Sequence, residues 1–145
     1  MLVAIGSDHG GFRLKEEIKK YLTKNGVAFS DFGTDSTESV DYPAIARDIA
    51  KAVADGQCQR GIIVCGTGIG VSIAANKIKG IRAALCHDEF SAEMSRAHND
   101  ANVLTMGERV IGVGLALAIV DKWLSTQFEG GRHAKRVAML AELEN

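Results

Sequence analysis

The sequence has little of several features that would assign it to a specialised class of protein. Its formal net charge at pH 7 is −1, with 17 lysines and arginines against 18 aspartates and glutamates, so it lacks the basic excess of nucleic-acid-binding proteins. No apolar run approaches the roughly 18 residues of a membrane-spanning helix, and no basic-then-apolar stretch opens the chain. We therefore expect no nucleic-acid partner, no membrane partner and no export.

Cysteine and proline are also scarce. The three cysteines, Cys58, Cys65 and Cys86, form no CxxC pair and leave an odd count, which favours reduced thiols in a cytoplasmic protein. The single proline, Pro43, suits the first turn of a helix. With 46% hydrophobic and 24% charged residues, the 145-residue chain has an ordinary globular composition. We expect one domain spanning residues 1–145.

Short apolar runs alternate with amphipathic stretches along the whole chain. Five strands are predicted, at 2–5, 27–32, 61–65, 81–86 and 101–106. Helical spacing marks the stretches between them, as with Leu14, Ile18 and Leu22, and two further helices are predicted at 113–124 and 133–143. This order predicts an α/β fold with a parallel sheet covered by helices on both faces. The lysines expected to form a solvent-exposed face of the first helix are Lys15, Lys19, Lys20 and Lys24.

The most informative stretch runs from Gly61 to Gly70, where an apolar strand leads into Cys-Gly-Thr-Gly-Ile-Gly. Alternate glycines let successive backbone N–H groups turn toward one point, which favours binding of an anion. Open α/β sheets bind their ligands at the carboxyl ends of their strands, where Cys65 is expected to lie. A thiol at this position indicates chemistry next to an oxyanion, so the loop is predicted to be an active site.

In a parallel sheet, the residues that follow each strand meet at one edge. The residues that follow the first, third and fifth predicted strands are Asp8, His9, Cys65 and Arg109. We expect these residues to converge. His98 and Asn99 instead end the fourth predicted helix, at the opposite edge of their own subunit's sheet. Their placement indicates that they serve a different site.

Two functions from other classes stay open at this point. The first is a nucleotide-binding module, because the alternate glycines resemble a dinucleotide loop. The loop lacks G-x-G-x-x-G spacing, and Asp88-Glu89 is a weak candidate for the acid that would bind the ribose. The second is a metal-binding protein that uses His9, Cys65 and His98. Zinc sites usually contain a closely spaced ligand pair, and this set has none.

Six motifs in a fixed order carry a further signal. They are Ser7–Gly11, Ser39–Pro43, Cys65–Lys77, Gly80–Ala84, Ser95–Asn102 and Gly130–His133. In their joint occurrence the chain resembles the type B ribose-5-phosphate isomerase family, and the resemblance extends over essentially the whole chain. That family lies in a wider group that includes galactose-6-phosphate and allose-6-phosphate isomerases.

The resemblance implies a cofactor-free, metal-free aldose–ketose isomerase that acts on a small sugar phosphate. It implies a Rossmann-like three-layer sandwich with a five-stranded parallel sheet. It also implies a homodimer or a dimer of dimers with shared active sites, in which the last helix packs on the partner. In family dimers, His98, Asn99 and Arg109 come from the neighbouring subunit. Ribose 5-phosphate is the expected substrate, with allose 6-phosphate and galactose 6-phosphate as alternatives.

The resemblance also implies the catalytic roles. Cys65 would move a proton between C2 and C1 of the sugar through a cis-enediolate, while Thr67 and the loop amides hold the enediolate oxygens. A free thiol is mostly protonated at neutral pH, so the loop must favour the thiolate. One branch of the family has a glutamate base where this chain has Val71. His98 would open the furanose ring, and Asp8 would take or order the proton of the anomeric hydroxyl.

The remaining site residues would bind the substrate. Arg132 and Arg136 lie four residues apart near the start of the last helix, which suits a phosphate dianion, although such pairs often form a solvent-exposed face. His9 and Arg109 are further phosphate candidates. The residues that would line the sugar and the enediolate are Tyr42, Asn99, Gly66, Gly68, Ile69 and Gly70.

Overall fold

Five strands form one parallel sheet in the order β2-β1-β3-β5-β4. The computed structural model describes residues 1–145, and its strands are β1 (Leu2–Ser7), β2 (Ala28–Asp31), β3 (Arg60–Cys65), β4 (Ala83–Leu85) and β5 (Val103–Gly107). Its α-helices are α1 (Phe12–Lys24), α2 (Tyr42–Ala54), α3 (Ile69–Ala75), α4 (Glu89–Ala97), α5 (Val113–Ser125) and α6 (Arg132–Glu142). None of these helices has both the length and the apolar character needed to span a membrane. The predicted alternation is confirmed, although β4 is shorter than expected.

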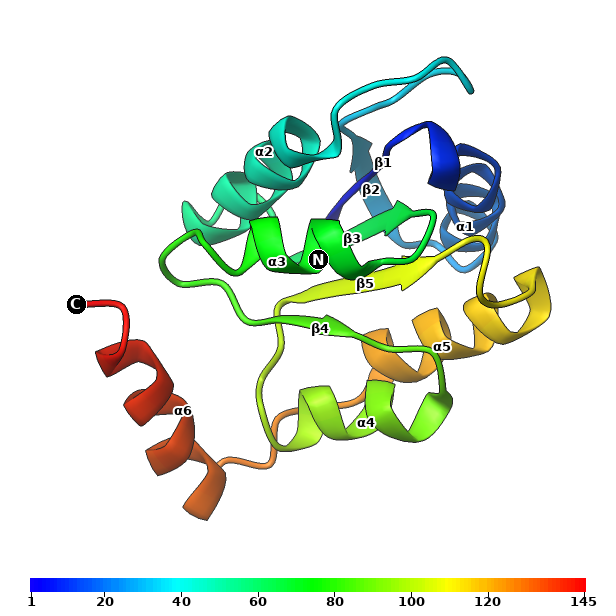
Figure 1. Ribbon diagram of the computed structural model, residues 1–145. Helices are drawn as coiled ribbons and strands as arrows, with labels where there is room; N and C mark the ends of the chain where they lie inside the picture. The colour runs from blue at the N-terminus through cyan, green and yellow to red at the C-terminus, as the bar shows by residue number, and fades with distance from the viewer.

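Helices cover both faces of the sheet (Figure 1). In β3, Ile62 and Val64 belong to the core formed with α1, α4 and α5, whereas Ile63 and Cys65 belong to the core formed with α2 and α3. This alternation is typical of a strand that is buried on both faces. The three-layer Rossmann-like sandwich is therefore confirmed, and Cys65 lies on the side of the sheet that α2 and α3 cover.

Cys65 and His98 lie at opposite edges of the sheet. Cys65 pairs with Gly107 where β3 and β5 end, whereas Val103 pairs with Gly61 near their beginnings. His98 caps the C-terminus of α4, shortly before the chain enters β5. A helix that connects two parallel strands runs back across the sheet, so its last residue reaches the amino edge. Within one chain, the thiol and this imidazole are therefore on opposite sides of the fold.

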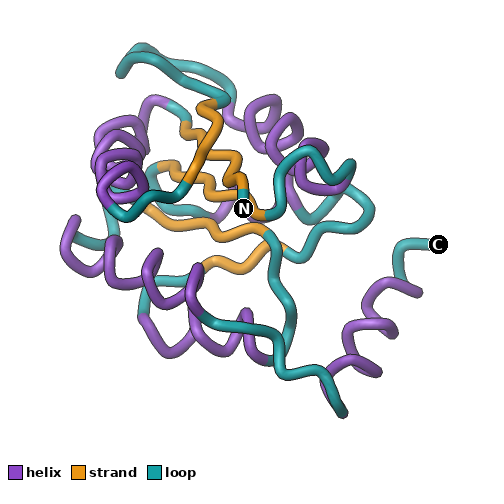
Figure 2. Tube along the Cα trace, turned by 180° about the vertical axis from the view of Figure 1, so that it is seen from behind, coloured by secondary structure: helices purple, strands orange, loops and turns teal.

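Helix α6 stands away from the three layers (Figures 1 and 2). Its only buried residue is His133, in the first turn. Met139, Leu140 and the capping residue Leu143 are exposed by 54%, 45% and 82%. Contiguous apolar side chains in solvent are a typical sign of a protein–protein contact, because their burial is favourable.

The prediction that Lys15 lies on a solvent-exposed face of α1 is wrong. Its side chain is 1% exposed, and its Nζ lies 2.9 Å from Oδ1 of Asp31. The same ammonium donates to the carbonyl of Thr34. Lys15 is adjacent to the buried residue Leu14, so its aliphatic stem follows the core-facing side of the helix. The ion pair ties α1 to the end of β2.

Lys15→Ala is expected to lower the free energy of unfolding by about 2 kcal/mol, measured by urea denaturation. Removal of one partner of a fully buried ion pair lowers the free energy of unfolding by about 3–5 kcal/mol. The loss should be smaller here because the side chain of Asp31 is 23% exposed. Lys20→Ala, on the same helix with a side chain 75% exposed, is the matched control and should change stability by less than about 0.5 kcal/mol. Equal stabilities of the two variants would show that the pair contributes nothing.

The destabilisation should also depend on pH. Burial alone would raise the pKa of Asp31, but hydrogen bonds from Lys19, from the Gly33 amide and from Lys15 hold this pKa below its usual value. A carboxyl group with a lowered folded-state pKa stabilises the fold above its unfolded-state pKa, and this contribution is lost as the pH falls through the folded-state value. The difference between wild type and Lys15→Ala should therefore shrink below about pH 4.

Candidate active site

The loop after β3 holds the Cys65 thiol against its own backbone. Sγ of Cys65 accepts a hydrogen bond from the Gly68 amide at 3.0 Å. Gly68 has a φ of +78°, and a β-carbon there would lie 2.6 Å from Cδ1 of Leu85. Glycine is therefore required for the backbone turn that brings this amide to the sulfur. The sulfur therefore has a fixed backbone hydrogen-bond donor.

Thr67 and Ile69 form the exposed rim of this loop. The Thr67 hydroxyl accepts a hydrogen bond from the Ile69 amide at 3.3 Å. Gly107 supports the loop from behind, since a β-carbon there would lie 2.6 Å from the carbonyl carbon of Thr67. The hydroxyl proton of Thr67 remains free to donate to an oxygen of a bound molecule.

Two side chains from other segments lie directly on the loop glycines. A β-carbon placed on Gly70 would lie 2.5 Å from Cζ of Tyr42, the first residue of α2. One placed on Gly66 would lie 3.1 Å from Nη1 of Arg109. The loop is therefore bordered by a phenol on one side and a guanidinium on the other.

The position of Arg109 differs from the expectation that it comes from the neighbouring subunit. Its backbone amide donates to the carbonyl of Gly66 in the same chain at 3.1 Å. The reason lies in the sheet: Gly107 pairs with Cys65 at the ends of β5 and β3, so Arg109 follows immediately beside the Cys65 loop. Arg109 therefore reaches the glycine loop of its own chain without a partner.

Asp8 holds a short turn that packs against the glycine loop. Its Oδ1 accepts hydrogen bonds from the amides of Gly10 and Gly11 at 2.9 and 3.2 Å. A β-carbon on Gly10 would lie 3.1 Å from the amide nitrogen of Gly66, and one on Gly11 would overlap the backbone of Val64. Both hydrogen bonds use the same carboxylate oxygen, so Oδ2 is available to a hydroxyl group of a ligand.

A polar cavity of about 280 Å³ lies beside this turn. Its lining residues are His9, Gly10, Arg13, Thr37, Glu108 and Arg109. Nδ1 of His9 accepts a hydrogen bond from the Val40 amide at 3.1 Å, so a neutral ring carries its proton on Nε2. Sequence analysis missed Arg13, whose only signal was its place in the first turn after the Asp8–His9 motif. Three basic side chains here suit an anionic group.

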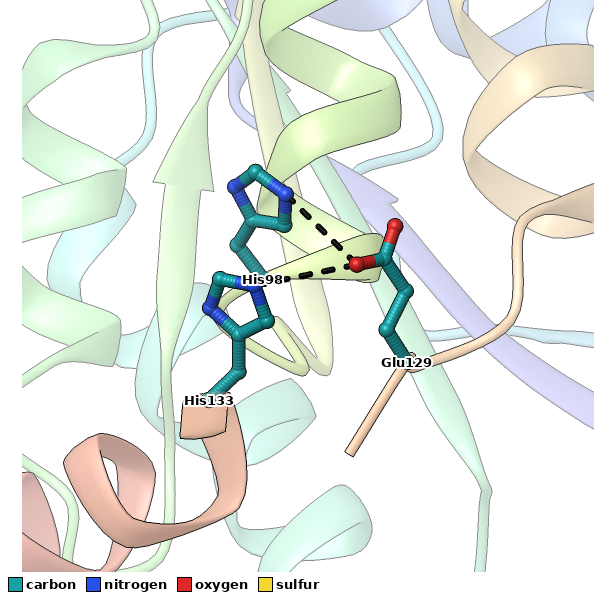
Figure 3. Close-up of side chains that lie close together, drawn as sticks. All are labelled: His98, Glu129 and His133. Atoms are coloured by element: carbon teal, nitrogen blue, oxygen red, sulfur yellow. Dashed lines mark ion pairs between the residues drawn. The ribbon is translucent and has the colours of Figure 1, made fainter. Parts of the chain in front are cut away.

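A second group of side chains gathers around His98, at the other edge of the sheet (Figure 3). The His98 ring stacks on the His133 ring, with centroids 4.1 Å apart and planes 11° from parallel. Oε1 of Glu129 lies 3.8 Å from Nε2 of His98 and 3.7 Å from Nε2 of His133. Sequence analysis included His133 in the Gly130–His133 motif but gave neither His133 nor Glu129 a catalytic or substrate-binding role, although their spacing of four residues was a usable signal.

The donor atoms of His98, Glu129 and His133 all lie within 4.8 Å of one another, as metal ligands can. The two rings are nearly parallel, however, so their in-plane lone pairs run side by side and do not converge. Zinc needs convergent nitrogens at about 2.0–2.1 Å. Within one chain, the alternative metal-ligand set of His9, Cys65 and His98 does not come together, because Cys65 and His98 lie at opposite edges of the sheet.

The side chains of Asn99, Arg132 and Arg136 are exposed, and they form no hydrogen bond or ion pair within the chain. Asn99 lines a cavity of about 470 Å³ that also touches Leu140 and Leu143 of the C-terminal segment. One chain therefore brings Asp8, His9, Tyr42, the glycine loop and Arg109 together. It leaves His98, Asn99 and the two arginines of α6 apart from them.

Comparison with known proteins shows agreement over nearly the whole chain. A family model described as ribose/galactose isomerase matches residues 3–140. Ribose-5-phosphate isomerase B of Escherichia coli is 53% identical over 142 residues, which cover 98% of this chain and 95% of the relative. D-erythrulose-4-phosphate isomerase of Pectobacterium atrosepticum is 46% identical over 144 residues, with coverage of 99% and 95%.

The fold agrees equally well with a solved structure. Ribose-5-phosphate isomerase B from Clostridium thermocellum matches with a TM-score of 0.98 and 58% identity, covering 99% of this chain and 97% of that one. Sequence and backbone therefore agree over nearly the whole chain. This chain is an isomerase, and it belongs to the ribose/galactose isomerase family.

Proposed function

We propose that this enzyme interconverts ribose 5-phosphate and ribulose 5-phosphate without a cofactor. The proposal is based mainly on the Cys65 thiol, whose sulfur accepts a hydrogen bond from the Gly68 amide at 3.0 Å. The loop that contains this thiol is bordered by Asp8, Tyr42 and Arg109. The relatives named ribose-5-phosphate isomerase B support the choice of substrate. The three free, buried cysteines are consistent with a reducing cytoplasm.

In the proposed reaction, the Cys65 thiolate removes the proton from C2 of the open-chain aldose. The C2–H electrons form the C1–C2 double bond, and the C1 carbonyl becomes an enediolate oxygen. The Thr67 hydroxyl and the loop amides donate hydrogen bonds to the two oxygens. The thiol then returns the proton to C1, and the hydroxyl proton moves from the C2 oxygen to the C1 oxygen, so that the C2 oxygen becomes the ketose carbonyl and the C1 oxygen a hydroxyl group. The thiolate is regenerated, so no redox cofactor is consumed.

Ring opening precedes this step in the proposal. His98 gives a proton to the furanose ring oxygen as the C1–O bond breaks, and Asp8 takes the proton of the anomeric hydroxyl. Cys65 and His98 lie at opposite edges of the sheet within one chain. A twofold homodimer would pair the glycine loop of each subunit with the C-terminal end of α4 of its neighbour, and a dimer of dimers would contain the same pairing. The exposed apolar side chains of α6 support such a partner contact.

Packing of α6 on the partner would carry Arg132 and Arg136 to the phosphate. Arg132→Ala and Arg136→Ala should each raise KM for the sugar phosphate by about 10- to 150-fold, since a charge-assisted hydrogen bond contributes about 1.5–3 kcal/mol. Steady-state kinetics measures this. The matched control is Lys135→Ala, another exposed cation on the same helix, which should leave KM unchanged. Unchanged KM in both arginine variants would leave the pair as a solvent-exposed face.

The length of the sugar is tested by comparing kcat/KM for ribose 5-phosphate and allose 6-phosphate with the purified enzyme. The family description includes galactose, and one of the relatives is named for a four-carbon substrate. Sugar phosphates of other lengths are therefore alternatives to ribose 5-phosphate as the substrate. We expect the higher value for ribose 5-phosphate. A higher value for allose 6-phosphate would replace the proposed substrate but not the reaction. Membership of an isomerase family leaves the nucleotide-binding alternative without support.

A further inference from the structure

His133 is buried without a hydrogen-bond partner. It is 8% exposed, and its Nε2 forms no hydrogen bond although it faces Oε1 of Glu129 at 3.7 Å. A buried polar atom without a partner destabilises a fold, so its presence calls for an explanation. The main chain holds the cluster in place, since the Glu129 amide donates to the carbonyl of Ala97 at the end of α4 at 3.0 Å. His98 follows Ala97 directly.

Stacking on His133 restricts the plane of the His98 ring. His98 is the C-cap residue of α4 and its side chain is 37% exposed, so without a neighbour its ring would rotate freely. A proton donor is effective only when it is held in the correct orientation, and fixing its ring in advance removes that entropic cost from the reaction. The His133 face, 4.1 Å away and nearly parallel, provides this restraint.

The charges around the two rings favour a single proton on the pair. Burial lowers the pKa of His133, and the nearby charges of His98, Arg132 and Arg136 lower it further, against the opposing effect of Glu129. Two protonated rings 4.1 Å apart would also repel each other. The Glu129 carboxylate, 3.8 Å from Nε2 of His98, attracts a protonated His98 ring. Because its pKa is lowered, His133 is the ring of the pair that stays neutral.

We propose that Glu129 and His133 are positioning residues for His98: His133 fixes the plane of its ring, and the Glu129 carboxylate, 3.8 Å from Nε2, holds the edge of that ring in place. This inference rests on the proposed ring-opening role of His98. Neither residue touches the substrate, so both act only through the His98 imidazole.

Kinetics of point variants on ribose 5-phosphate test the assignment. Glu129→Gln and His133→Ala should each lower kcat about 10-fold, as is usual when a group that orients a catalytic side chain is removed. His133→Phe keeps a flat ring for stacking and should recover part of the loss. Glu142→Gln, an exposed carboxylate on α6, is the control and should match wild type. Circular dichroism checks the fold of each variant.

Two further readouts separate positioning from a general structural effect. The double variant His98→Ala/His133→Ala should be no slower than His98→Ala alone, because residues that act as one unit do not add. In Glu129→Gln, kcat should fall while KM stays near the wild-type value, because this residue does not touch the substrate. A structural defect of the site would raise KM as well.

The possible failures are distinguishable. Wild-type kcat in His98→Ala would reject the proposed ring-opening role and this inference with it. Two outcomes would overturn only the inference, provided that His98→Ala is impaired. One is wild-type kcat in both Glu129→Gln and His133→Ala. The other is a loss in the double variant that equals the sum of the two single losses. Loss of wild-type activity on treatment with a chelator, restored by zinc, would identify the cluster as a metal centre and would also overturn it.

Discussion

Replacing Cys65 with alanine is expected to lower kcat by about two to four orders of magnitude and to leave the fold intact, since a positioned acid–base group contributes about this much. The thiol is the only titratable side chain of the glycine loop, and the Gly68 amide donates to its sulfur at 3.0 Å. Steady-state kinetics on ribose 5-phosphate measures the loss. Cys65→Ser, which keeps the size of the side chain, guards against a packing effect and should be similarly impaired.

The other two cysteines are the matched controls for this prediction. Burial raises the pKa of Cys58, and burial is also the main reason why the pKa of Cys86 is raised to about 11, so both thiols stay protonated at neutral pH. Cys58→Ala and Cys86→Ala should therefore keep most of the activity. If Cys65→Ala retains more than about a tenth of wild-type kcat, Cys65 is not the base.

Mixing two inactive variants is expected to restore activity. Cys65→Ala and His98→Ala should each be nearly inactive alone, because each removes one half of every shared site. Unfolded together and refolded, they should form mixed dimers in which one site carries both substitutions and the other carries neither. With random pairing, about half of the dimers are mixed and half of their sites are intact, so activity should return to about a quarter of wild type.

The result of this experiment decides whether the site is shared. The structure places Cys65 at the carboxyl ends of β3 and β5 and His98 at the other edge of the sheet, so one chain cannot bring both to one small sugar. Mass spectrometry under native conditions confirms that mixed dimers have formed. Absence of recovery in a sample that contains them would show that both residues serve the same subunit's site.

Local patterns in the sequence determined the layers and the position of the loop. The period of two in β3 and the spacing of four in α1 reflect burial of fixed faces of a strand and of a helix, so they can be recognised without a structure. The alternation of strands and helices then implies a parallel sheet, and a parallel sheet brings Asp8, Cys65 and Arg109 to one edge. The opposite location of His98 follows from the same rule.

Contacts between segments far apart in the sequence were decided only by the tertiary structure. Helical spacing alone could not show that Lys15 would meet Asp31, and a family resemblance misplaced Arg109, which lies beside Gly66 of its own chain. The stack of His98 on His133 depends on how the segment after α5 returns to the end of α4. Sequence periodicity records which face of an element is buried, whereas the identity of the neighbours on that face depends on how whole elements pack.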